Sequence, residues 1–136
     1  MTISSKRAPR LRYHADAYRF VSAALPYAQK LLNRSYTANM DAGGADDESA
    51  HITGPELLDG IRRFALENFG LLTLTVFRRW GIRTTDDFGR IVFELIDRGE
   101  LRKTDRDRLS DFYAVYDFED VFDRDYMIDA GKAFRN

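Results

Sequence analysis

Two histidines are the side chains of this sequence best suited to proton transfer or metal binding. They are His14 and His51, and each precedes a stretch with helical periodicity. If the two helix starts met, with Asp16 nearby, the three side chains would form a His/Asp cluster able to hold a metal ion or exchange a proton. The alternative is that each histidine serves its own helix start, because no HExxH or similar spacing is present. We predict no metal site and keep a metal-binding protein or enzyme built on His14 and His51 as a third hypothesis.

Carboxylates are abundant toward the C-terminal end of the chain. Catalysis by paired acids needs one carboxyl group raised in pKa by burial beside one that stays ionised. Here the acids alternate with Arg106, Arg108 and Arg124 in polar sequence, which is typical of a solvated surface. The chain has no cysteine, calcium loop, P-loop, dinucleotide fingerprint or GxSxG motif. We therefore predict no catalytic residue and no cofactor.

Arginine and aromatic residues gather in two stretches whose composition is typical of binding surfaces. One surrounds a turn between two predicted helices, where three arginines have no local acidic counterpart. The other is a predicted aromatic hairpin. The predicted interaction patch comprises Arg78, Arg79, Trp80, Arg83, Phe112, Tyr113 and Tyr116. The alternative is that Trp80 anchors the core and the arginines are merely solvated.

The overall composition is that of one soluble, folded domain. The chain has 136 residues, of which 44% are hydrophobic and 32% charged, and its 21 basic and 22 acidic side chains leave a net charge of −1. One core is expected at this length, and such a balanced charge gives no long-range attraction to nucleic acid or to an anionic membrane. Because no run of about 18 apolar residues occurs, we expect a cytoplasmic protein with no membrane partner.

Four helices are predicted to position these side chains. Apolar residues recur at three- and four-residue steps over 14–33, 53–69, 71–80 and 85–98. Pro26 should break or kink the first helix near Ser22 to Leu25, because proline lacks a backbone donor. Thr53 and Glu56 have the form of a capping box, and Thr85 is expected to cap the fourth helix.

The third predicted helix, LLTLTVFRRW, is apolar on most sides and should lie in the middle of the fold. Leu71 and Leu72 are predicted to be buried, with Thr73 and Thr75 left for solvent. Gly81 is expected to end this helix.

A helix-turn-helix followed by a hairpin would resemble a winged-helix DNA-binding domain. The hairpin is predicted from Leu101 to Lys103 and from Phe112 to Tyr116, which are rich in β-forming residues. The exposed face of the 85–98 helix, however, carries more acid than base, whereas a phosphate-facing helix should be basic. The fold predicted is mainly α, a single domain of four or five helices with a helix-turn-helix-like core and a short winged-helix-like C-terminal hairpin.

The domain boundaries follow from changes in composition. Residues 1–12 are predicted to form a flexible basic arm, and 13–122 the helical domain, interrupted by an acidic loop at about 34–50. Residues 123–136 are predicted to be a loosely ordered tail, after a short helix over 117–122.

Three blocks together resemble a conserved hypothetical family of small proteins from planctomycetes and verrucomicrobia. They are RYHADAYRFV, HITGPELLDGIRRFALENFGLLTLTVFRRWGIRTTDDFGRIVFELIDRGEL and DFYAVYDFEDVF, which cover most of residues 12 to 122. The resemblance rests on the FGLL, WGI, DFG, IVF and VYDF elements at these spacings. It implies no activity, cofactor or partner, so no functional residue is carried over from it.

The sequence therefore predicts a non-enzymatic protein-interaction or regulatory module whose partner is another protein. The alternative is a winged-helix-like nucleic-acid-binding protein that uses the basic arm and the arginine cluster. The oligomeric state is not predicted.

Overall fold

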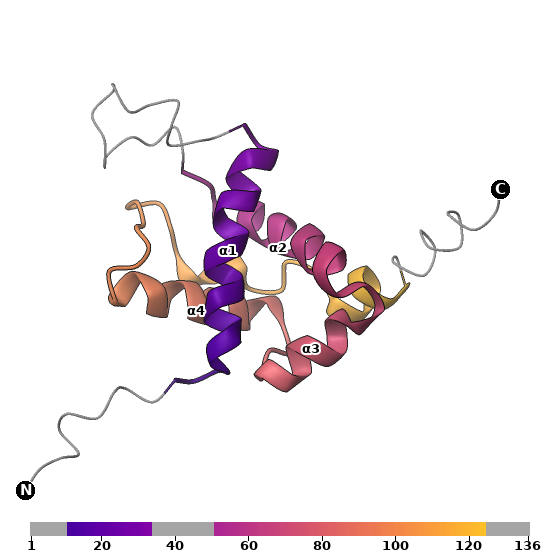
Figure 1. Ribbon diagram of the computed structural model, residues 1–136. Helices are drawn as coiled ribbons and strands as arrows, with labels where there is room; N and C mark the ends of the chain where they lie inside the picture. Colours follow the sequence, from indigo (N-terminus) through magenta and orange to yellow (C-terminus); the bar gives the residue numbers. More distant parts are fainter. Residues whose placement is uncertain (1–10, 34–50, 125–136) are drawn as a thin grey trace, which may run out of the picture.

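The computed structural model describes residues 11–33 and 51–124, which are built from helices joined by short turns (Figure 1). The α-helices are α1 (Ala15–Leu31), α2 (Gly54–Phe69), α3 (Thr73–Trp80) and α4 (Thr85–Asp97). The shorter segments are the 3-10 turns η5 (Gly70–Leu72) and η6 (Leu109–Phe112) and the π-helical turn η7 (Asp120–Arg124). The prediction of a mainly α fold is confirmed.

Helix α1 lies across α2 and α4, and α3 packs beside the N-terminal half of α1 (Figure 1). Small residues line the buried face of α1 at helical spacing, so the other helices approach it closely. Aromatic rings from all parts of the described chain fill the space between the helices. The most deeply buried large side chains are Val21, Leu58, Ile61, Phe77, Ile82, Phe88, Ile91, Leu95 and Phe122.

The predicted helix boundaries at Thr53 and Gly81 are confirmed. The amide of Glu56 donates to Thr53 Oγ1 over 3.2 Å, and the amide of Thr53 donates to Glu56 Oε1 over 2.9 Å, so the capping box is complete. Gly81 ends α3 with a φ of 87°, a conformation that side chains other than glycine strongly disfavour. The turn after it delivers the chain directly into α4.

Pro26 does not break the first helix, which runs without interruption from Ala15 to Leu31. Proline removes the amide that would have bonded to the carbonyl of Ser22. Because Ser22 and Pro26 both lie on the exposed face of α1, that carbonyl can bond to water instead. The predicted break is therefore wrong.

The segment between α2 and α4 is oriented differently from the prediction. The chain makes a 3-10 turn over Gly70–Leu72, which leaves Leu71 and Leu72 60% and 63% exposed. Thr73, predicted to face solvent, is fully buried, and its hydroxyl donates to the carbonyl of Gly70 over 2.7 Å. Only Phe77 of α3 is buried as fully, so α3 is half exposed rather than central.

The predicted C-terminal hairpin is wrong, since no residue between 51 and 124 is in a strand. Thr85 does not cap α4; that position belongs to Thr84. The Thr85 hydroxyl is buried, donates to the carbonyl of Phe112 over 2.7 Å and accepts from the amide of Val115 over 3.1 Å. These side-chain bonds satisfy backbone groups that a partner strand would otherwise satisfy, so the winged-helix architecture has no support.

The predicted domain limits can be followed only in part. The basic arm up to residue 10, the acidic loop at 34–50 and the tail from 125 lie outside the described residues. Arg12 pairs with Glu94 over 3.7 Å. The short C-terminal helix is present in altered form, as a π-helical turn that reaches Arg124 and follows the buried Phe118.

Helices α1 and α2 approach each other closely where Gly60 of α2 meets Ala28 of α1. A methyl group added at Gly60 would lie 2.5 Å from the Cβ of Ala28, which is fixed to the backbone and cannot rotate away. Alanine gains about 1 kcal/mol of helix propensity over glycine, but overpacking of this kind costs about 1–3 kcal/mol. We expect Gly60→Ala to lower the free energy of unfolding by about 1–2 kcal/mol in urea denaturation.

The matched control for that substitution is the exchanged pair. Gly60→Ala combined with Ala28→Gly moves the methyl group to the other helix and should recover much of the loss in packing, although glycine at 28 lowers helix propensity. A Gly60→Ala variant that unfolds at the same or a higher urea concentration than the natural protein would contradict the close approach.

Candidate functional site

Three arginines on and after α3 project into solvent. Arg78, Arg79 and Arg83 are exposed, and among the described residues no carboxylate lies within ion-pair distance of their guanidinium groups. Most other arginines in the described segments do have such a partner, for example Arg90 with Asp87 and Arg62 with Asp59. The predicted cluster of uncompensated charge is therefore present at this turn.

Trp80 follows the alternative that the sequence left open, because it contributes to the core. Its ring packs against Phe20 of α1, Phe69 at the end of α2 and Phe77 of α3, with centroid distances of 5.4, 5.6 and 6.1 Å. It is partly buried. Trp80 therefore anchors α3, and the arginines beside it remain outside.

The aromatic part of the predicted patch divides between core and surface. Phe112 is buried, and Tyr116 is turned inward with its hydroxyl donating to the carbonyl of Leu58 over 2.7 Å. Burial raises the pKa of Tyr116 well above the usual tyrosine value. Tyr113 alone of the three is exposed, at 46%. Phe112 and Tyr116 are thus structural and unavailable to a partner, which corrects their predicted role.

Charges on the outer face of α4 are largely satisfied within the protein. Arg98 lies 3.8 Å from Glu94, as the i, i+4 spacing predicts, whereas Arg90 pairs with Asp87 over 2.9 Å rather than with Glu94. Tyrosines of α1 add to this network: Tyr13 donates to Asp87 Oδ1 over 2.6 Å, and Tyr18 donates to Glu94. Burial, and then the bond to Asp87, raises the pKa of Tyr13 to about 12, so this phenol stays a donor at neutral pH. This face is engaged in holding α1 on α4.

The two histidines do not share partners. His14 caps α1, its Nδ1 accepting the amide of Asp16 over 3.1 Å, in agreement with the local reading of the sequence. His51 instead borders a groove lined by Leu25 from the far half of α1, roughly 16 Å along the helix axis from His14 at 1.5 Å per residue. Among the described residues, no three His, Asp or Glu side chains are arranged to hold a metal ion.

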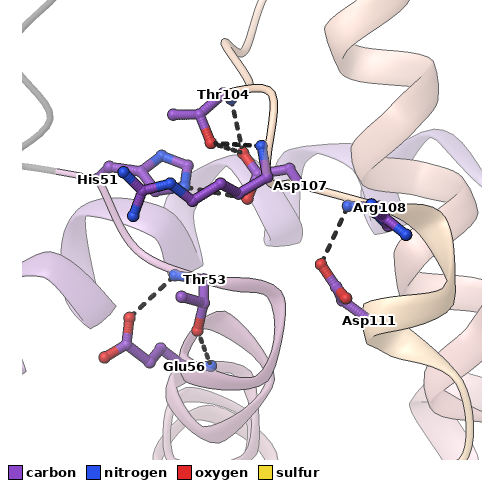
Figure 2. Close-up of polar contacts among 8 residues, drawn as sticks. His51, Thr53, Glu56, Thr104, Asp107, Arg108 and Asp111 are labelled. Atoms are coloured by element: carbon purple, nitrogen blue, oxygen red, sulfur yellow. Dashed lines mark hydrogen bonds and ion pairs between the residues drawn. The ribbon is translucent and has the colours of Figure 1, made fainter.

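His51 pairs with a carboxylate that sequence reasoning missed. Figure 2 shows its ring, from the segment leading into α2, directed at Asp107 on the loop after α4. His51 Nε2 lies 3.0 Å from Asp107 Oδ1, and Asp107 Oδ2 accepts the Thr104 amide over 2.8 Å. Both side chains are mostly buried, at 25% and 17% exposure. A pairing across 56 residues leaves no local signal, and only the TDRD turn at 104–107, with its capping aspartate, marks one partner.

The His51–Asp107 pair borders a groove of about 530 Å³. Its walls come from the second half of α1, the start of α2, the end of α4 and the loop at 99–107. A second, smaller hollow of about 320 Å³ lies between the end of α1 and the first half of α2. The larger groove is within the range that proteins use for small molecules.

Within the described segments, no helix is both long and apolar enough to cross a membrane. No protein-family model, curated protein or solved structure matches the chain.

Proposed function

We propose that this chain is a non-enzymatic, cytoplasmic binding protein that docks another protein on the outer face of η5 and α3. The function class and the three arginines are those predicted from the sequence, whereas exposed residues of η5 and α3 take the place of the predicted aromatic residues. The observation that carries it is the juxtaposition of three arginines lacking a carboxylate partner in the described segments with two strongly exposed leucines. The docking face comprises Leu71, Leu72, Thr75, Arg78, Arg79 and Arg83.

Helical spacing supports a continuous face. Thr75 is exposed and stands three and four residues before Arg78 and Arg79, which places the three side chains on one side of α3. Leu71 is four residues before Thr75, and Leu72 directly precedes α3. The face therefore runs from an apolar end at η5 to a cationic end at Arg83.

The chemistry of this face favours an acidic partner with an apolar contact point. Burial of a leucine side chain contributes about 1.5–3 kcal/mol, and arginine forms paired hydrogen bonds with a carboxylate. The docking face itself matches the composition of interface centres, where arginine and apolar side chains are enriched.

Nucleic acid is the alternative partner, and the leucines favour protein over it. Phosphate contacts need cations and hydrogen-bond donors, and they leave two exposed leucines unexplained. The α4 face that a helix-turn-helix would direct into DNA is closed by its own ion pairs and by α1.

The test replaces the three arginines together. We expect Arg78→Glu/Arg79→Glu/Arg83→Glu to weaken partner binding by about tenfold or more, because each exposed charge then repels the acidic surface. Cross-linking identifies the partner: a photoreactive amino acid at Thr75, in the full-length chain, is activated in nuclease-treated extract of the native host. Affinity for the identified protein is then measured by calorimetry for each variant.

The control is the variant Arg19→Glu/Lys30→Glu/Arg106→Glu, which changes the net charge by the same amount at positions outside the docking face. It should leave the affinity nearly unchanged. Leu71→Ser/Leu72→Ser should also weaken binding. Capture of a nucleic acid whose binding is unaffected by the leucine substitutions would overturn the proposal. Equal affinity of the partner for the natural protein and the triple arginine variant would also overturn it.

A further inference from the structure

The groove beside His51 lies apart from the docking face and has the make-up of a small-molecule site. None of the residues of the docking face lines it. The groove lies where four segments of the chain meet. Two of its lining residues, Leu25 and Leu101, are more than 70 residues apart in the sequence. Because these walls belong to packed helices and a hydrogen-bonded loop, the site is largely preformed.

Five apolar side chains in the lining of the groove are here called its floor, and the charged residues at 100–107 its mouth. Leu25 and Ile52 meet Leu57 at the start of α2, while Phe93 and Ile96 come from the last turns of α4. A groove of about 530 Å³ with these apolar side chains in its lining has room for a hydrocarbon chain or ring of roughly ten to twenty non-hydrogen atoms.

The mouth of the groove differs from the floor in its charges. Two of its three carboxylates are already engaged: Asp107 accepts from Thr104 and contacts His51, and Glu100 lies 3.8 Å from Arg98. The third, Asp105, is on the exposed turn. Lys103, by contrast, has no carboxylate within ion-pair distance among the described residues, and its Nζ lies 5.9 Å from the ring centroid of Phe93. This cation therefore stands directly above the apolar floor.

We infer that the groove binds a small amphiphilic carboxylic acid. The hydrocarbon part occupies the floor between Phe93 and Leu57, and the carboxylate lies at the mouth beside Lys103. The His51–Asp107 pair also borders the groove, and it joins the segment that enters α2 to the loop that carries Lys103. In an acid of this kind the carboxylate contacts the Lys103 ammonium group while the hydrocarbon leaves water. A ligand with only one of these two groups would make only one of the two favourable contacts.

The test compares three ten-carbon probes below their micelle concentrations: decanoate, decanol and decylamine. In amide NMR titrations of the full-length protein, decanoate should shift signals of groove residues such as Leu57, Gly99 and Lys103, with a dissociation constant at or below about 1 mM. Decanol should bind about tenfold more weakly, and decylamine more weakly still, because the amine is repelled by Lys103.

Two variants test separately the contact of the carboxylate with Lys103 and the contact of the hydrocarbon with the floor. Lys103→Glu should weaken decanoate binding by about tenfold or more, and should bring decylamine binding up toward it. Ile96→Trp, which adds bulk to the floor, should abolish binding of all three probes. Lys30→Glu makes the same charge change on α1 outside the groove and should leave the titrations unchanged.

Tighter binding of decylamine than of decanoate to the natural protein would overturn the assignment of an acid. Absence of shifts at the groove, or equal decanoate affinity in the Lys103→Glu and Lys30→Glu variants, would overturn the site itself. All three variants are checked for native amide spectra before titration.

Discussion

Replacement of Phe77 by alanine is expected to lower the free energy of unfolding by about 3–5 kcal/mol. Phe77 is fully buried and packs edge to face on Phe88 and Phe122, with centroid distances of 5.1 and 5.3 Å. It also contacts Phe20 of α1 and Phe118, so one ring links α1, α3, α4 and the C-terminal turn. Its removal would leave a cavity bordered by rigid aromatic edges, which cannot collapse to fill it.

The magnitude matters because domains of this size are stable by about 5–15 kcal/mol in total. The Phe77→Ala variant should therefore lose about a fifth or more of its stability, measured by urea denaturation followed with circular dichroism. Leu72→Ala is the matched control. It also truncates a large apolar side chain to alanine close to Phe77 in the chain, but at a position that is 63% exposed, so it should change stability by no more than about 0.5 kcal/mol. Equal effects of the two substitutions would contradict the described orientation of α3.

Asp87→Asn is expected to lower the free energy of unfolding by about 2–3 kcal/mol, although the two side chains have nearly the same shape. One carboxylate oxygen of Asp87 accepts from Tyr13 over 2.6 Å and the other from the amide of Arg83 over 2.7 Å. The Thr84 amide and Arg90 bond to the same group. Asparagine offers one acceptor oxygen and one NH₂ group, so on one side donors would face a donor.

The pH dependence gives this prediction a second measurement. Burial alone would raise the pKa of Asp87, but the bonds from Tyr13, Arg83 and Thr84, with the charge of Arg90, outweigh burial and hold the pKa below its usual value. A lowered pKa in the folded state means that the contribution to stability is complete above the unfolded pKa, near 4, and is lost as the pH falls through the folded value. The Asn variant should lack this part of the acid-induced loss.

Asp97→Asn serves as the control because Asp97 is exposed on the same helix and lies outside the Asp87 network. It should unfold within about 0.5 kcal/mol of the natural protein. If Asp87→Asn behaved in the same way, the hydrogen bonds at the start of α4 would not anchor α1.

Local signals were sufficient to predict most helix ends. Thr53 with Glu56 and the glycine at 81 act through groups within four residues, so the sequence around them contains the full cause of the structure. The burial of Phe88, Ile91 and Leu95 likewise follows from one stripe on one helix.

Predictions that depended on distant groups were less accurate. The β-forming residues 112–116 form turns because Thr85 and Asp86, about 28 residues earlier, bind their backbone groups; strand propensity depends on such surroundings. Thr73 is buried instead of Leu72 because a 3-10 turn at η5 changes the rotation of the following helix.

The two candidate sites also differ in whether their residues are close together in the sequence. The cationic turn at Arg78 to Arg83 was visible in the sequence because its residues are neighbours. The groove was not, since His51, Phe93 and Lys103 meet only after α1, α2 and α4 have packed.

The position of Trp80 has an optical consequence. It is the only tryptophan in the sequence, and its indole ring lies against Phe20 of α1 and Phe69 of α2, where those helices meet α3. Tryptophan emission therefore comes from a single place in the molecule, and a red shift of that emission reports water entering this junction. Trp80 is thus an intrinsic fluorescent probe of the packing of α1 against α3, and the measurement needs no label and no added substitution.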